Sequence, residues 1–145
     1  MELPVYVTAE EVQRVCQTLK IRDWTQLADA RVTPEEARVI LQEVNTEGMP
    51  IPLVDFVIGL EVELEHGTRF QDANVTNNHP ILTGKIVLAH FKESLDYYRL
   101  LEVAELEGDL LKATVRGDAA KIREYYKRLA KARIVLHQAE LDRLG

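Results

Sequence analysis

Apolar residues recur at a helical spacing along almost the whole chain of 145 residues, and this pattern most limits what the chain can fold into. Near the N-terminus, Val12, Val15, Cys16 and Leu19 follow the i, i+3, i+4, i+7 spacing of one helical face. No stretch of any length alternates with the two-residue period of a strand. The sequence therefore predicts an all-α protein, a single-domain bundle of about five helices over residues 1–145.

Helix start signals divide this pattern into separate elements. The segments Thr8-Ala-Glu-Glu11 and Thr33-Pro-Glu-Glu36 both have the spacing of a capping box, in which a threonine and a glutamate satisfy free backbone N–H groups. Trp24 lies in the connector between the two helices that these boxes begin, and we expect it to be buried. Near the other end of the chain, Asp118 is expected to cap a last long helix.

The centre of the chain is predicted to form a helical hairpin. Its two helices are expected over Leu53–His66 and Thr83–Leu101, joined by an Asn-rich loop, with Gly67 as the left-handed residue that ends the first helix. The second helix is apolar on two sides, which is typical of a central, buried helix. His90 is therefore expected to be an interior histidine that needs hydrogen-bonding partners.

Each hairpin helix carries a glutamate and a histidine three residues apart, which places both side chains on one helical face. If the helices pack against each other, the four groups meet. Glu-x-x-His pairs on facing helices are how helical bundles build metal sites, and this ligand set suits zinc, iron or manganese. The candidate ligands are Glu63, His66, His90 and Glu93, and the expected supporting residues are His79, Asp96 and Tyr97.

A purely structural explanation of the same residues is also open. In it, His66 interacts with the C-terminal end of its helix, His90 is hydrogen-bonded in the interior, and the glutamates are solvated. The second helix also reads His-x-x-Glu and not Glu-x-x-His. Ser94 is the only serine and no arrangement of nucleophile and base is visible, so any enzymatic activity would have to act through the metal.

The charge of the chain is unevenly distributed. Its 18 Lys and Arg and 24 Asp and Glu give a formal net charge of -6. Residues 1–111 hold 9 basic and 20 acidic residues, whereas Lys112–Arg133 hold 8 basic residues against Asp118 and Glu124. A basic last helix on an acidic body can pair with another copy or an acidic partner, although the charge pattern alone favours a solvated helix face. The candidate interaction residues are Lys121, Arg123, Lys127, Arg128 and Lys131.

The cysteine content and the N-terminus bear on compartment. Cys16 is the single cysteine and lies on an apolar helical stripe, so it is expected to be a small core thiol with no internal disulfide. The sequence shows no signal-peptide pattern and no long uninterrupted apolar run. We therefore expect a cytoplasmic protein, of a cell or an infected host, or a component of a virion, with no membrane partner.

Several motifs in the central part of the chain occur together, in order, in a known family. They are Gly59-Leu-Glu-Val-Glu-Leu-Glu-His-Gly67, Asn74-Val-Thr-Asn77, Leu82-Thr-Gly-Lys-Ile86, Ala89-His90 and Asp96-Tyr-Tyr98. This run closely resembles the DUF5661 family of bacterial and phage proteins, which has no established activity. A weaker similarity extends to the first helix and Trp24. The resemblance implies a shared core over residues 53–102, with the helix at 33–47 as an insertion and 109–145 as a basic C-terminal helical extension.

The chain also departs from the family pattern. Proteins that it resembles usually carry two acidic residues after the Asn-Val-Thr-Asn motif, where this chain has Asn78 and His79. Any metal-binding role of that acidic pair does not carry over to this chain. The insertion and the extension are interpreted as surfaces for assembly.

Two functions from different classes follow. The leading hypothesis is a non-enzymatic structural or assembly protein, associated with a phage virion, that packs against itself or a larger complex through a strap at Met1–Val7, the inserted helix and the basic last helix. The alternative is a helical protein that binds a divalent metal, or a metal-dependent enzyme. Nucleic-acid binding by the basic helix is a weaker hypothesis, because the overall charge is acidic.

Overall fold

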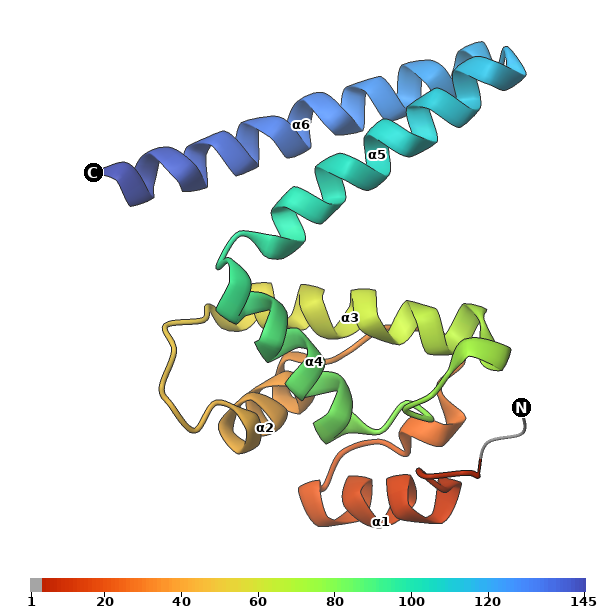
Figure 1. The fold of residues 1–145 in the computed structure, drawn as a ribbon, viewed down its shortest axis with the longest axis vertical. Coiled ribbons are helices and arrows are strands. Elements are labelled where there is room, and N and C mark those ends of the chain that lie inside the picture. The colour runs from red at the N-terminus through yellow and green to blue at the C-terminus, as the bar shows by residue number, and fades with distance from the viewer. Residues whose placement is uncertain (1–3) are drawn as a thin grey trace. The chain divides into compact units, whose positions relative to one another are not determined.

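Residues 4–145 are described by the computed structural model, and their secondary structure is entirely helical, which confirms the predicted all-α fold (Figure 1). Over this range there are six α-helices and two short 3-10 helices. The elements are α1 (Ala9–Leu19), η1 (Trp24–Gln26), α2 (Pro34–Val44), α3 (Leu53–Arg69), η2 (Gln71–Ala73), α4 (Pro80–Glu93), α5 (Tyr97–Arg116) and α6 (Ala119–Leu144). The chain divides into two compact units, Met1–Glu93 and Ser94–Gly145, which we describe separately.

The first two α-helices begin where the capping signals predict. The Thr8 hydroxyl accepts a hydrogen bond from Glu11 N–H, while the Glu11 carboxylate forms a two-point contact with Arg14. The second helix has the complete capping box, in which Thr33 and Glu36 each accept a hydrogen bond from the other's backbone N–H. The predicted capping box is therefore complete at Thr33, whereas at Thr8 only the threonine half forms.

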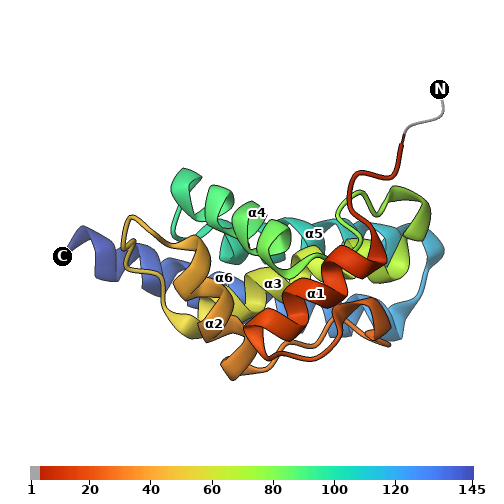
Figure 2. The same cartoon turned by 90° about the horizontal axis from the view of Figure 1, so that it is seen from below.

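Unit 1 is built around α2, α3 and α4, which pack against one another, while α1 contacts η1 and α4 (Figure 2). The apolar side chains at the centre of this packing are fully buried; they include Val12, Trp24, Ile40, Phe56, Leu60 and Val87. The predicted burial of Trp24 is confirmed. No helix in the part of the chain that the structure describes is long and apolar enough to cross a bilayer.

Gly84 allows α4 to approach α2 closely. A Cβ atom at this position would lie 2.5 Å from Ile40 Cγ2 and 3.3 Å from Val44 Cγ1, which is closer than packed carbon atoms tolerate. The expectation that Thr83 opens this helix was wrong, because α4 begins at Pro80. Gly84 is thus an interior residue of α4, and its lack of a side chain lets α4 lie close to α2.

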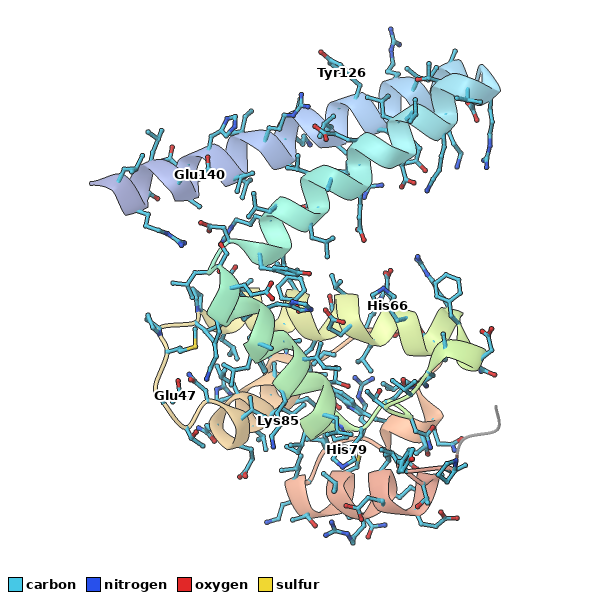
Figure 3. All side chains as sticks on the ribbon, in the orientation of Figure 1. Glu47, His66, His79, Lys85, Tyr126 and Glu140 are labelled. Atoms are coloured by element: carbon cyan, nitrogen blue, oxygen red, sulfur yellow. The ribbon has the colours of Figure 1, made fainter. Side chains whose placement is uncertain are left out.

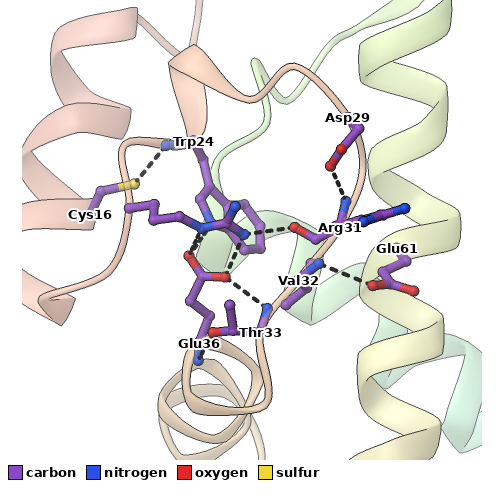
Figure 4. A network of polar contacts seen from close by, with 9 residues as sticks. Cys16, Trp24, Asp29, Arg31, Val32, Thr33, Glu36 and Glu61 are labelled. Carbon is purple, nitrogen blue, oxygen red and sulfur yellow. Dashed lines mark hydrogen bonds and ion pairs between the residues drawn. The ribbon is translucent and has the colours of Figure 1, made fainter.

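A polar network joins the connector to α2 (Figure 4). The Glu36 carboxylate is buried and accepts two hydrogen bonds from Arg22, at 2.9 and 2.7 Å, and one from the Trp24 indole at 3.3 Å. Burial alone would raise the pKa of Glu36, but the hydrogen bonds from Arg22, Thr33 N–H and Trp24 outweigh it, so the pKa is lowered. Cys16 Sγ lies 3.5 Å from Trp24 N, beside this network.

The first helix of the predicted hairpin is longer than expected. It continues through Gly67 to Arg69, and Gly67 is not among the glycines with positive φ. Gly67 is buried against the following loop, where a Cβ atom would collide with the Asn78 side chain and lie 3.0 Å from Asn74 Nδ2. The role predicted for Gly67, a left-handed helix end, was therefore wrong. The glycine makes room for the loop.

The second helix of the predicted hairpin is interrupted. The expected helix Thr83–Leu101 is instead α4, which ends at Glu93, followed by α5, which begins at Tyr97. In the turn between them, Ser94 Oγ accepts from Asp96 N–H and the Ser94 carbonyl accepts from Tyr97 N–H, both at 3.1 Å. Serine side chains compete with helical backbone hydrogen bonds in this way. The break gives six α-helices where about five were expected.

Unit 2 is an antiparallel hairpin of α5 and α6 (Figure 1). Gly117, in the left-handed conformation at φ 69°, ends α5, and Asp118 caps α6 by accepting from Lys121 N–H at 3.0 Å, as predicted. The buried seam between the helices consists of Leu106, Leu129 and Ala132, with Val103, Leu110 and Tyr125 packed around them.

The predicted N-terminal strap falls partly outside the described residues, since Met1, Glu2 and Leu3 are not described. Val5 and Tyr6 are exposed, at 78% and 80% of their surface. The Val7 carbonyl accepts a hydrogen bond from Asn77 Nδ2 at 3.4 Å, which ties this end of the segment to the loop before α4.

Candidate functional site

The four candidate ligands of the central hairpin lie in a row across α3 and α4. Glu63 Oε1 is 3.5 Å from His90 Nε2, and Glu63 Oε2 is 3.8 Å from His66 Nδ1. On the other side of His90, its Nδ1 lies 3.7 Å from Glu93 Oε2. The order in space is therefore Glu93, His90, Glu63, His66. The three-residue spacing in each helix and the packing of α3 on α4 together produce this arrangement.

This row is half open to solvent. The exposed side-chain fractions are 14% for Glu63, 27% for His90, 66% for His66 and 68% for Glu93. His90 is thus at the edge of the core and not inside it, which corrects the interior position expected for it. The contacts are longer than good hydrogen bonds and are attractive as ion pairs only when the imidazoles carry a proton.

The row does not form a ready metal site. Among the described residues, no group of three or more His, Cys, Asp or Glu side chains could hold a metal ion. A zinc site needs ligand atoms that converge on one point at about 2.0 to 2.2 Å, whereas the ion-pair contacts along this row join successive side chains at 3.5 to 3.8 Å. Binding of zinc, iron or manganese would require these side chains to change rotamer.

His79 has a structural role that the sequence did not reveal. It is buried, and its Nδ1 accepts from the backbone N–H groups of Ile81 at 3.2 Å and Leu82 at 3.4 Å, the first free donors of α4. Burial lowers the pKa of His79, and the nearby Glu11 carboxylate opposes this only in part. The structure thus shows His79 as the cap of α4 and does not test its expected supporting role at a metal. Figure 3 labels this side chain.

The other two expected supporting residues belong to unit 2. Asp96 is buried, and its carboxylate contacts the guanidinium groups of Arg99 at 3.1 Å and Arg143 at 2.9 Å. The Tyr97 ring packs edge-on against Tyr98, with 5.1 Å between the ring centroids. Asp96 therefore joins the end of α6 to the start of α5.

A small hollow of about 180 Å³ opens at the C-terminal end of α3. The motifs that end at Gly67, begin at Asn74 and begin at Leu82 all contribute to its lining. At its edge, Asn74 Nδ2 donates to the Gly67 carbonyl and to Asn78 Oδ1. The lining residues are Glu63, His66, Gly67, Ala73, Asn74, Val75, Thr76, Thr83 and Ile86. Thr76 and Thr83 lie in motifs that the sequence analysis singled out, but they were given no role at a site. The consecutive residues Asn77 and Asn78 adopt the left-handed conformation and turn the loop towards α4. The asparagine-rich sequence predicted a turn here but not which residues are left-handed.

The basic residues predicted as an interaction surface all lie exposed on α6. They are Lys121, Arg123, Lys127, Arg128 and Lys131. Lys121 and Arg128 lie over the Tyr125 ring, each with its charged group 5.9 Å from the ring centroid. Tyr125 itself packs into the hairpin seam, whereas Tyr126 is 64% exposed (Figure 3).

A second apolar seam runs along α6, apart from the one that packs against α5. Its members recur at spacings of 4, 3, 4 and 3 residues, the heptad spacing of a helix interface, and all are exposed. We call it the outer stripe; it consists of Ala130, Ile134, His137, Leu141 and Leu144. The exposed fractions are 69% for Ile134, 61% for Leu141 and 82% for Leu144.

Comparison with known proteins gives one result. A family model described as a protein of unknown function, DUF5661, matches residues 12–107, more than half of the chain. The chain belongs to the DUF5661 family. No curated protein and no solved structure matches it.

Some of the candidate sites lie inside the DUF5661 match and others lie outside it. It contains the row from Glu63 to Glu93 and the hollow at the end of α3, and it begins at residue 12, well before the core expected at 53–102. It also spans the helix at 33–47 that was interpreted as an insertion. It ends at residue 107, inside α5, so the outer stripe lies beyond the DUF5661 segment.

Proposed function

We propose that this DUF5661 protein is a non-enzymatic assembly protein and that the outer stripe of α6 packs against another polypeptide chain. The observation that carries this proposal is the exposure of Ile134, Leu141 and Leu144, each more than 60% accessible and each on one helical line. A helix that is apolar on two faces is typically covered on both. The association with a phage virion is one form of this proposal, in which the second chain belongs to the particle.

Two further features of unit 2 support a protein partner. The α5 helix also exposes large apolar residues, namely Leu100, Leu111 and Val115. Large contiguous apolar patches on a protein surface mark interaction sites, and these residues add to the exposed apolar surface of unit 2. The exposed basic residues of α6 lie on the same helix as the outer stripe, where they attract an acidic partner and speed its approach.

The proposal is tested by amine-specific cross-linking and mass spectrometry in the cells or particles that contain the protein. Lys127 and Lys131 lie next to the outer stripe, and Lys20 and Lys85 are exposed lysines of unit 1 that serve as internal controls. We expect intermolecular cross-links at the first pair, and their loss in the double variant Ile134→Glu, Leu141→Glu. Cross-links that are confined to the control lysines, or that survive in the double variant, would contradict the proposal.

Divalent metal binding at the row of α3 and α4 is the second candidate function. One observation favours it: both imidazole rings lie within 3.8 Å of the single Glu63 carboxylate. The expected outcome is stoichiometric binding of Zn²⁺ or Mn²⁺ in calorimetric titration, weakened at least about tenfold in Glu63→Gln. Glu65→Gln, on the same helix and paired with Arg69, is the control. Equal affinities in the two variants would show that the metal binds elsewhere.

A further inference from the structure

We infer that the chain bound by the outer stripe is a second copy of this protein, and that the two α6 helices pair antiparallel. This inference rests on the proposed function and names its partner. The stripe runs over residues 130–144, about 21 Å of helix at 1.5 Å per residue. That length accommodates two heptads, and a two-fold axis across it makes the stripe its own partner surface in a closed dimer.

The side chains of the stripe complement one another in the antiparallel arrangement. With the two-fold axis between Val135 and Leu136, Ala130 meets Leu141 of the second copy and Ile134 meets His137 of the second copy. At each end of the interface, Leu144 meets the aliphatic stem of Lys127 of the second copy. The two inner layers each pair a larger apolar residue with a smaller or flatter one, the outer layer pairs Leu144 with the Lys127 stem, and every layer occurs twice. Alternating sizes across facing positions are what a packed helix interface requires.

Charges beside the stripe select this register. Arg133 and Glu140 lie on the same edge of α6, one heptad apart. In the antiparallel register described, Arg133 faces Glu140 of the second copy, and the same pair recurs on the other side of the axis. Shifting the antiparallel register by one heptad sets Glu140 against its own copy, and a parallel pairing sets Arg133 near Gln138. Neither alternative forms the ion pair.

The contact that Arg133 already makes is compatible with this pairing. Its Nη2 donates to Glu107 Oε1 of α5 at 2.6 Å, and the side chain is still 47% exposed. A guanidinium group carries five N–H donors and can hold two carboxylates at once. The opposite edge brings Lys131 near Gln138 of the second copy, a pairing without like charges.

The first test is sedimentation equilibrium of the full chain from about 1 µM to about 1 mM, a range that covers ordinary dimer affinities. We expect a monomer–dimer equilibrium, weakened at least about a hundredfold by Ile134→Glu with Leu141→Glu. Val54→Glu is the matched control, because Val54 is 65% exposed in unit 1, and it should leave the equilibrium unchanged. His137→Leu should strengthen the dimer about tenfold or more, because it completes the apolar stripe.

The second test addresses the register. Glu140→Arg places two arginines face to face in the antiparallel dimer and should weaken it about tenfold. In a parallel dimer Glu140 lies near Gly145 of the second copy, so the same change should have no effect.

A monomer at all concentrations, or a dimer indifferent to the stripe variants, overturns the inference of a second copy. If the purified chain is monomeric while the in-cell cross-links at Lys127 and Lys131 reach a different protein, this inference fails and the proposed function stands. Circular dichroism of each variant shows whether its helices are intact.

Discussion

Glu36 illustrates what local sequence can and cannot predict about a single residue. The spacing of Thr33 and Glu36 predicted the capping box that the structure contains. It did not predict that the same carboxylate is 4% exposed and bound by Arg22 and Trp24. Those partners lie 14 and 12 residues away, so their approach depends on how the connector folds back onto α2. Because the pKa of Glu36 is lowered, this network stabilises the fold above about pH 4.3 and is lost as the pH falls through the lower folded value.

His79 gives a prediction at the same scale. In the folded protein its ring accepts hydrogen bonds at Nδ1 and its pKa is lowered by burial, whereas the unfolded chain takes up a proton near pH 6.5. The free energy of unfolding should therefore fall as the pH drops from about 6.5 through the folded pKa. His79→Asn retains an acceptor at the cap but cannot titrate. Denaturant unfolding from pH 8 to pH 5 should show a smaller decrease for this variant, and identical pH profiles would refute the role assigned to the ring.

At the scale of elements, the sequence predicted that helices exist and often where they begin, but not where they stop. Periodicity alone joins α4 and α5 into one helix, because apolar residues continue on both sides of Ser94. The interruption depends on hydrogen bonds inside the turn and on the ion pairs of Asp96 with Arg99 and Arg143. The last partner is contributed by the far end of α6, which no local pattern indicates.

Two helical glycines give a matched test of element packing. Gly84→Ala pushes a methyl group against Ile40, which is fully buried, and should lower the free energy of unfolding by about 1 to 3 kcal/mol. Gly108 lies in the interior of α5 with no atom within 4 Å of a Cβ. Gly108→Ala should therefore raise stability by about 0.5 to 1 kcal/mol, through helix propensity alone. Chemical denaturation measures both, and equal effects of the two substitutions would rule out the close contact at Gly84.

At the scale of the whole molecule, the fold class predicted from the sequence was correct, and the predicted candidate site was incomplete. The row of Glu63, His66, His90 and Glu93 does assemble, because residue spacing and helix packing together determine it. The hollow beside it could not be predicted, since it depends on how a loop with two left-handed asparagines closes over Gly67. The outer stripe was present in the sequence as a heptad but was hidden by the basic residues interleaved with it.

The reactivity of the Cys16 thiol can report on the opening of unit 1. It is the only cysteine, it is 1% exposed, and burial raises the pKa of its thiol. Both effects suppress reaction with thiol reagents. We expect labelling of the native protein at neutral pH to be slow and to accelerate with denaturant in parallel with the loss of helical circular dichroism. Rapid labelling without denaturant would mean that α1 opens independently of the rest of unit 1.

The position of α6 after α5 in the chain has a consequence for synthesis on the ribosome. A protein made from its N-terminus presents unit 1, with its own core, before α6 has been translated. During that interval α5 has no helix against which to bury Leu106 and Ala113. A single helix of this length is only marginally stable in water, so the hairpin forms once α6 has also emerged. Until then its apolar seam is accessible to chaperones and to neighbouring nascent chains on the same message. Copies of this protein are therefore close together at the moment when their last helices fold.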